Sequence, residues 1–180
     1  SLPGLTLVTG RFDEAKEILL TFAHYCQNGI VPNRFSDKAG DIPLYNTVDA
    51  SLWFFNAVLQ YLKYTADFDF VQKNLWQTLT SIVKKHVEGT IYGIHVDKDG
   101  LLAHGPQLTW MDVATLDGFI TPRNGKAVEI QALWYNALKI MQLLSSRFEH
   151  EQEQRTYSQM ARKARLSFAE KFWNQTSGYL

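Results

Sequence analysis

The strongest constraint in this sequence is an alternation between segments that are apolar on almost every helical face and segments that are charged on one face. Residues 48–65 and 127–148 carry apolar side chains nearly all round a helix, so both are expected to be buried on most sides. Residues 11–27, 68–87 and 150–172 place charged side chains opposite an apolar face, which indicates partly exposed helices. The chain is therefore predicted to be all-α, with inner helices covered by outer ones.

Connection lengths predict how these helices pair. A few residues separate each inner helix from the following outer one, whereas residues 28–46 and 88–126 form long connections back to the next inner helix. If residues 2–9 end another buried helix, the chain holds three helical hairpins. Loops longer than about 12 to 15 residues are uncommon in compact domains unless they serve a function. Function is therefore expected on the loop face, at the N-terminal ends of the inner helices.

The second long loop contains a predicted β-hairpin. Short β-prone runs at 92–96 and 101–103 flank an Asp-Lys-Asp-Gly turn, and Asp-Gly is a favoured hairpin signal.

The chain opens at Ser1 in an apolar run and closes at Leu180 soon after a Ser-Gly turn, unlike the polar ends usual for domains. The sequence is therefore expected to be part of a longer protein.

Composition argues against several function classes. Lys and Arg number 18 and so do Asp and Glu, so the chain lacks the basic excess of a nucleic-acid-binding protein. No run reaches the roughly 18 apolar residues of a membrane span. The single cysteine, Cys26, favours a reducing, cytoplasmic location. No metal or cofactor is expected, because His95 and His104 are isolated and no phosphate-binding glycine loop is present.

The loop face is rich in carboxylates and aromatic side chains. A Thr-Trp-Met-Asp run at residues 109–112 lies inside the long loop, and Asp49 and Glu129 fall near the starts of the two inner helices. Two carboxylic groups flanking a bond are what glycoside hydrolysis needs. An aromatic ring beside them offers a face for the C–H groups of a sugar. The carboxylates are therefore predicted to face one pocket.

Each of these residues also has a purely structural interpretation. Asp49 can complement the positive end of its helix beside a Thr47 cap, and Glu129 has the same alternative behind an Asn124 cap. Trp110 can be a core aromatic, and Asp112 can be a turn residue. Spacing alone leaves both interpretations open.

Four segments carry a family resemblance. They are residues 1–11, residues 45–54, the Thr-Trp-Met-Asp run at 109–112, and residues 121–135, which begin Thr-Pro-Arg-Asn-Gly. In order, and over almost the whole chain, they resemble the C-terminal amylo-α-1,6-glucosidase domain of glycogen debranching enzymes, especially the bacterial and archaeal type. The resemblance implies an (α/α)6 barrel, with six inner helices inside six outer ones. Residues 1–180 are then expected to be the N-terminal portion, about half, of that barrel.

The resemblance also implies roles for individual residues. Asp112 is expected to be the general acid of a glycoside hydrolase that cleaves α-1,6-linked glucose at branch points of glycogen or a related α-glucan, with inversion. Residues matching Asp49 and Glu129 are expected to shape the sugar pocket and Arg123 to help hold it. From the loop face, Trp110, Asn46 and Asn33 join this substrate-binding set. The catalytic base, and an Arg-Asp motif that precedes the first segment in the family, are expected outside the chain.

Two alternatives stay open. One is another six-hairpin α-glycosidase, such as a trehalase-like enzyme, although the Thr-Pro-Arg-Asn-Gly run favours debranching. The other is a carbohydrate-binding helical domain without turnover. Half a barrel leaves apolar flanks of its first and third inner helices open, and large exposed apolar patches are rare on soluble monomers. The chain alone is therefore expected to be inactive and to self-associate or to pair with the missing half.

Overall fold

A computed structural model describes residues 2–36, 42–116 and 118–180 of the chain. Its more buried and more exposed helices alternate along the chain, as the hydrophobic periodicity predicts. In chain order they are the π-helical turn η1 (Pro3–Leu7), α1 (Phe12–His24), α2 (Asp49–Thr65), α3 (Phe68–Asn74), α4 (Trp76–Glu88), the 3-10 turn η2 (Ile91–Gly93), β1 (His95–Val96), β2 (Leu102–Ala103), β3 (Ala114–Thr115), β4 (Gly118–Phe119), α5 (Val128–Arg147) and α6 (Glu151–Phe172).

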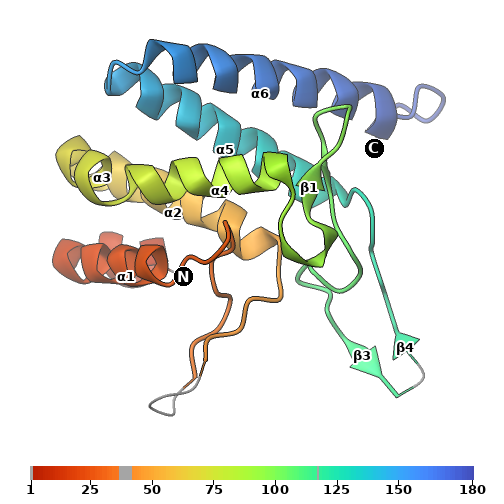
Figure 1. The fold of residues 1–180 in the computed structure, drawn as a ribbon, viewed down its shortest axis with the longest axis horizontal. Coiled ribbons are helices and arrows are strands. Elements are labelled where there is room, and N and C mark those ends of the chain that lie inside the picture. The colour runs from red at the N-terminus through yellow and green to blue at the C-terminus, as the bar shows by residue number, and fades with distance from the viewer. Residues whose placement is uncertain (1, 37–41, 117) are drawn as a thin grey trace.

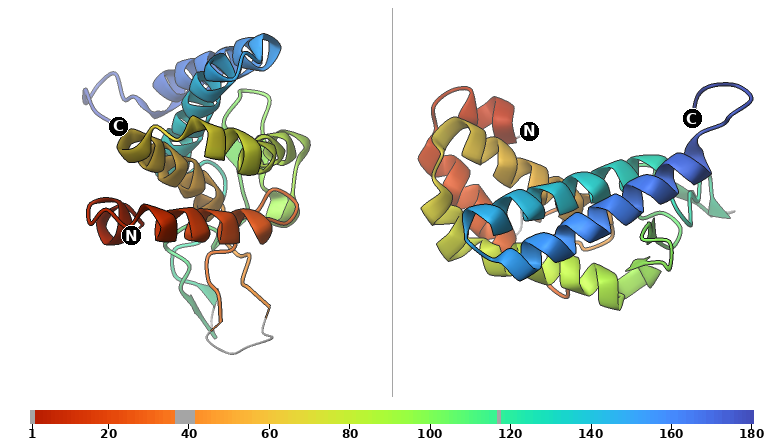
Figure 2. Two further views of the ribbon diagram at one scale, coloured as in Figure 1. Left: turned by 90° about the vertical axis from the view of Figure 1, so that its left-hand side faces the viewer. Right: turned by 90° about the horizontal axis from the view of Figure 1, so that it is seen from above.

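In chain order the helices form three hairpins: η1 with α1, α2 with α3 and α4, and α5 with α6. Figures 1 and 2 show α5 and α6 running side by side along one edge of the molecule, with α1 at the opposite edge. Helix α2 contacts η1 and α1 on one side and α5 on the other. The all-α prediction with paired inner and outer helices is confirmed.

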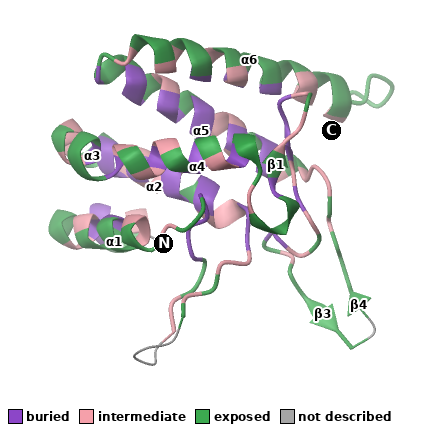
Figure 3. Ribbon diagram, in the orientation of Figure 1, coloured by how far each residue is buried: buried purple, intermediate pink, exposed green. Residues whose placement is uncertain are grey.

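Burial separates the inner helices from the outer ones, as their sequences require. Helix α2 buries Leu52, Phe55 and Val58 completely, and α5 buries Trp134 and Met141 completely. Helix α6 keeps only three described residues buried along its length, and Figure 3 shows it mostly exposed. A helix that is apolar all round must be covered on several sides, so α2 and α5 form the core against which the others pack.

Two details of the predicted helices are wrong. The single helix expected over residues 68–87 is broken at Leu75, whose φ of −115° departs from helical values while its side chain is fully buried. Thr47 does not cap α2, because the N-cap position is taken by Val48 and no side chain caps it. The Val48 N–H instead donates to the Leu108 carbonyl oxygen at 2.7 Å, so the long loop holds the start of this helix.

Both long loops lie on the face where α2 and α5 begin. Figure 1 shows the segment before α2 and the β3–β4 segment extending together to the same side of the helices. This confirms the predicted loop face. The predicted hairpin is present as β1 and β2, with shorter strands, and its register pairs His95 with Ala103. The β3–β4 hairpin was not predicted, although an Asp-Gly pair at 117–118 is the same sequence signal.

The β1–β2 hairpin is fastened to α5 by buried polar groups. The Gln131 side chain accepts a hydrogen bond from the Leu102 N–H and donates one to the Leu102 carbonyl oxygen, both at 2.8 Å. The Trp134 Nε1–H donates to the Gly100 carbonyl oxygen at 3.1 Å. Buried backbone groups need such partners, so the side chains of an inner helix replace the missing neighbour strand.

A buried histidine lies where α4 meets α5. His86 has no exposed surface, its Nδ1 lies 2.8 Å from the Ile82 carbonyl oxygen, and its ring stacks on Trp134 with centroids 6.1 Å apart. Burial lowers the pKa of His86 from 6.5 to about 4, and the bond to Ile82 offsets this only in part. His86 is therefore neutral in the folded chain at neutral pH.

We predict that the helical core loses stability as the pH falls from 7 to 5. The unfolded chain protonates His86 near pH 6.5 and the folded chain only near pH 4, so the unfolded state binds more protons in this window. The loss from this group is about 2 kcal/mol at pH 5. Urea unfolding at both pH values measures it.

His86→Gln should remove that part of the pH dependence, and His86→Phe, which can keep the stacking on Trp134, should do the same. His24→Gln, at an exposed position on α1, is the control and should leave the pH dependence as it is. An unaltered pH dependence in both His86 variants would contradict the prediction.

Candidate functional site

Asp49 is the first residue of α2 and lies half-buried. Burial raises the pKa of its carboxyl group, the Thr47 side chain and the N–H groups at the helix start lower it, and the negative charge of Glu129 raises it further. The structural interpretation of Asp49, at the helix end, and the functional one, beside another carboxylate, are therefore compatible. It complements the helix N-terminus, and it also shares a charged site with a carboxylate from the other inner helix.

Glu129 stands in the first turn of α5 and is paired with Arg123. One Arg123 Nη lies 2.5 Å from Glu129 Oε2, and the two side chains are 23% and 31% exposed. The other carboxylate oxygen, Oε1, is buried without a hydrogen-bond partner. Arg123 itself adopts a left-handed backbone conformation with φ of 46°. One oxygen of the Glu129 carboxylate is thus paired with Arg123, and the other is an acceptor without a donor.

The Thr-Trp-Met-Asp run is tied to this pair through its methionine. An Arg123 Nη lies 3.6 Å from Met111 Sδ, and the Met111 N–H donates to the hydroxyl of the buried Thr109. Asp112 is exposed, and its carbonyl oxygen accepts a hydrogen bond from the Gln107 side chain at 3.2 Å. Trp110 is 64% exposed, so it is not a core aromatic.

The two asparagines take different places at the same site. Asn33 is exposed and, together with Asp49, lines a cavity of about 360 Å³ whose other walls are mostly apolar side chains of α1 and α2. Asn46 is half-buried, and its Oδ1 has no hydrogen-bond partner. Buried side-chain oxygens of Asn46, Thr47 and Glu129 therefore have no hydrogen-bond partner near the starts of α2 and α5.

The structure joins Arg123 to Glu129 and to Met111 by direct contacts, and the negative charge of Glu129 acts on the Asp49 carboxyl group. It does not join the Asp112 carboxylate to Asp49 or Glu129 by a hydrogen bond in the part of the chain that it describes. Sequence reasoning missed Met111 and Gln107. Their position inside or just before the Thr-Trp-Met-Asp run was the available signal. The roles assigned to all these residues stay predictions.

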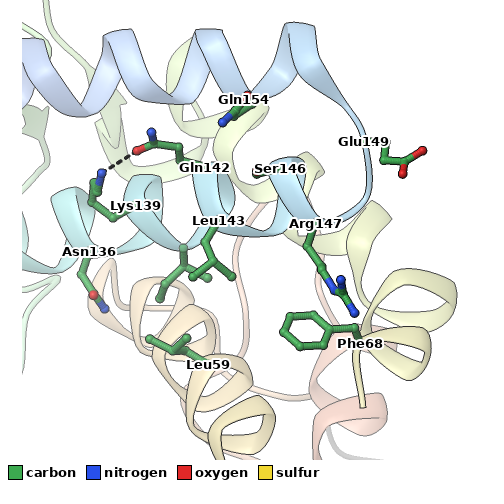
Figure 4. Close-up of a pocket in the computed structure, with 11 residues that line it drawn as sticks. Leu59, Phe68, Asn136, Lys139, Gln142, Leu143, Ser146, Arg147, Glu149 and Gln154 are labelled. Atoms are coloured by element: carbon green, nitrogen blue, oxygen red, sulfur yellow. Dashed lines mark hydrogen bonds between the residues drawn. The ribbon is translucent and has the colours of Figure 1, made fainter. Parts of the chain in front are cut away.

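A larger cavity lies away from this site. It is an open groove of about 890 Å³ between α2 and α5, and Figure 4 shows Leu59 and Leu143 on its walls. Two cations there are already engaged: Lys139 with Gln142, and Arg147 over the Phe68 ring. With 47% of Leu143 exposed, the groove marks an open apolar flank of the third inner helix. On the first, Leu5 and Val8 are 67% and 65% exposed.

Two further features of the described chain bear on its class. Within residues 2–36, 42–116 and 118–180, no helix is long and apolar enough to cross a membrane. The same residues hold no cluster of three or more His, Cys, Asp or Glu side chains suited to a metal ion.

Comparison with solved structures identifies the fold class. A rhamnosidase from Klebsiella oxytoca with rhamnose bound matches 92% of this chain and 30% of its own, with a TM-score of 0.66 and 20% sequence identity. Such a likeness concerns the fold, which is that of the six-hairpin glycosidases. The predicted relation of the three hairpins to an (α/α)6 barrel is thereby confirmed.

The chain belongs to the amylo-alpha-1,6-glucosidase family, whose model matches residues 1–180. It is also 29% identical over 198 residues to the glycogen debranching enzyme of Saccharomyces cerevisiae (strain ATCC 204508 / S288c). That match takes in 78% of this chain but only 13% of the yeast protein, so the chain spans a small part of its relative. The resemblance carried by the four sequence segments is confirmed.

We predict that Glu129→Gln lowers the pKa of Asp49, because the negative charge of Glu129 disfavours ionisation of its neighbour. NMR titration of the Asp49 carboxyl carbon measures the change. Glu149→Gln is the control, since Glu149 lies at the far end of α5, on the large groove. A pKa of Asp49 that responds equally to both substitutions would show that the two carboxylates do not share a site.

Proposed function

We propose that this chain is part of a glycoside hydrolase that cleaves α-1,6-linked glucose at branch points of glycogen or a related α-glucan. Asp112 is the general acid, and the reaction proceeds with inversion. The catalytic base comes from outside residues 1–180, in the rest of a barrel of which this chain forms about half. Family membership supports the reaction class, and the geometry of the loop face supports the placement of the sugar.

The observation that carries the proposal is the set of unsatisfied acceptors beside the charged pair. Asn46 Oδ1 and Glu129 Oε1 are buried without donors, which is costly unless a ligand supplies them. A glucose ring carries several hydroxyl groups that can donate to such oxygens. Arg123 supplies hydrogen-bond donors beside these acceptors, because its N–H groups can donate to the sugar or glycosidic oxygens. The Asn33 and Asp49 cavity extends this pocket beside α1 and α2.

Asp112 fits the acid role by its position. It follows Met111, which touches Arg123, so it lies on the same loop as the residues next to the pocket while its side chain stays exposed to an arriving substrate. An inverting enzyme holds its two carboxylates about 6.5–9.5 Å apart, so that a water molecule fits between the base and the sugar. Asp112 needs a partner across the sugar at that separation, and we place that partner in the rest of the barrel.

In the natural full-length protein, Asp112→Asn should lower kcat for a branched limit dextrin by about 10²–10⁴-fold, because proton donation to the leaving oxygen is lost. Glucose release measures kcat, and calorimetry with the same dextrin should show nearly unchanged binding. Asp13→Asn, at an exposed position on α1, is the matched control. If Asp112→Asn keeps more than half of kcat, the acid assignment is wrong and a carbohydrate-binding domain without turnover becomes the better interpretation.

Trp110→Ala should raise KM for the dextrin with little effect on the melting temperature. The Trp110 ring is 64% exposed, so its removal opens no core cavity, while a sugar that stacks on it loses a contact surface. Trp134→Ala gives the contrasting case, because Trp134 is fully buried and its loss should cost about 3–5 kcal/mol of stability. A Trp110→Ala variant with a strongly lowered melting temperature and an unaltered KM would place the ring in the core.

A further inference from the structure

An ion-pair cluster outside the proposed sugar pocket joins the β1–β2 turn to Lys126, two residues before α5 begins. The Lys126 Nζ lies 2.7 Å from Asp97 Oδ2 and 2.8 Å from Asp99 Oδ2, and Asp99 Oδ2 is also 2.7 Å from the Nζ of Lys171 in the last turn of α6. The Lys126 and Asp99 side chains are only 23% and 15% exposed. Ion pairs shielded from water in this way are stronger than pairs on an open surface.

The charges in this cluster are mutually stabilised. Burial raises the pKa of Asp99, but the hydrogen bonds from Lys126 and Lys171 outweigh it and leave the pKa well below its usual range. Burial likewise lowers the pKa of Lys126, and the bonds to Asp97 and Asp99 more than compensate. The cluster is therefore fully ionised at neutral pH and persists as a charged clamp.

The β1–β2 hairpin does not depend on Lys126 for its own anchorage. Gln131 holds both polar groups of the Leu102 backbone, Trp134 holds the Gly100 carbonyl, and Ser167 donates to the Asp99 carbonyl at 2.7 Å. The hairpin is thus a fixed platform on α5 and α6. What Lys126 adds is an attachment of its own segment, residues 121–127, to that platform.

That segment has a backbone that needs such an attachment. Arg123 and Gly125 both have positive φ, of 46° and 94°, and the left-handed conformation is unfavourable for a non-glycine residue such as Arg123. Backbone hydrogen bonds between His104 and Gly125 hold one edge of the segment. A further backbone bond runs from the Gln107 N–H to the Pro122 carbonyl oxygen at 3.0 Å. Lys126 lies three residues from both Arg123 and Glu129 in sequence, and its ion pairs add a side-chain attachment to these backbone bonds.

We infer that Lys126 is a positioning residue, which holds residues 121–127 on the β1–β2 platform so that Arg123 meets Glu129 in the geometry that binds the sugar. The effect on catalysis rests on the proposed function, whereas the effect on Arg123 itself does not. Lys171 provides a matched comparison, because it binds the same Asp99 oxygen from α6 and lies on another segment.

The kinetic test compares Lys126→Gln with Lys171→Gln in the full-length protein. Lys126→Gln should lower kcat/KM for limit dextrin by about 10- to 100-fold, mainly through KM, because displacements near 1 Å in a site have effects of this size. Lys171→Gln should change KM by less than about twofold, since Asp99 keeps Lys126 and residues 121–127 stay in place. Lys126→Arg, which retains the charge, should restore most of the loss.

The second test reads Arg123 directly and needs no activity. Paired with Glu129, Arg123 is a poor trypsin site, because a protease needs its target segment to open. Lys126→Gln should release the fragment that ends at Arg123 several-fold faster than wild type or Lys171→Gln, as followed by mass spectrometry. Asp97→Asn, which removes one of the two partners of Lys126, should give an intermediate rate even if Lys126→Gln folds poorly.

Equal cleavage after Arg123 in the Lys126 and Lys171 variants would overturn the inference and leave the cluster a purely structural clamp. An unchanged KM for Lys126→Gln in an active enzyme would overturn it as well. A wild-type protein without glucosidase activity would remove the proposed function, but the cleavage rates would still decide whether Lys126 positions Arg123.

Discussion

The burial of α2 and α5 on several sides is the constraint on which the rest of the structure depends. The polar side chains that these helices bury, Ser51, Gln131 and Ser145, are uncharged, and the candidate ionisable groups of the site lie at the ends where the loops begin. Asp49 and Glu129 stand at two such ends, and the negative charge of Glu129 adds to the burial that raises the pKa of Asp49. The positive N-terminal ends of both helices stabilise the two negative charges, and the guanidinium of Arg123 pairs with Glu129.

The loops that meet these helix ends are built by side chains of the helices as much as by their own backbone. Gln131 and Trp134 point out of an inner helix to bind hairpin backbone, while Val48, just before the other inner helix, gives its N–H to Leu108. The conformation of these loops therefore depends on the positions of the inner helices. A substitution inside α5 can displace the site even when it touches none of the acidic residues.

Hydrophobic periodicity was sufficient to predict the helices, their pairing and the face that carries the loops, because these follow from which surfaces must be buried. It failed at Leu75, where no glycine or proline marks the break and only the packing of a buried leucine reveals it. The Thr47 cap was also wrong, because the Val48 N–H at the start of α2 donates its hydrogen bond to the carbonyl oxygen of the distant Leu108. Pairings such as Lys126 with Asp99 depend on tertiary proximity, which has no signature in the spacing of residues.

The contacts between α6 and the β1–β2 turn have a consequence for folding of the chain during its synthesis. The Ser167 hydroxyl and the Asp99 carbonyl are 68 residues apart in sequence, and Lys171 is further still from its aspartate. At about 5–20 residues per second, a ribosome makes the 45 residues from Lys126 to Lys171 in roughly 2–9 s. During that interval the acidic turn lacks the Lys171 cation and the Ser167 donor, so the contacts of the β1–β2 turn are complete only after α6 has been synthesised and has docked.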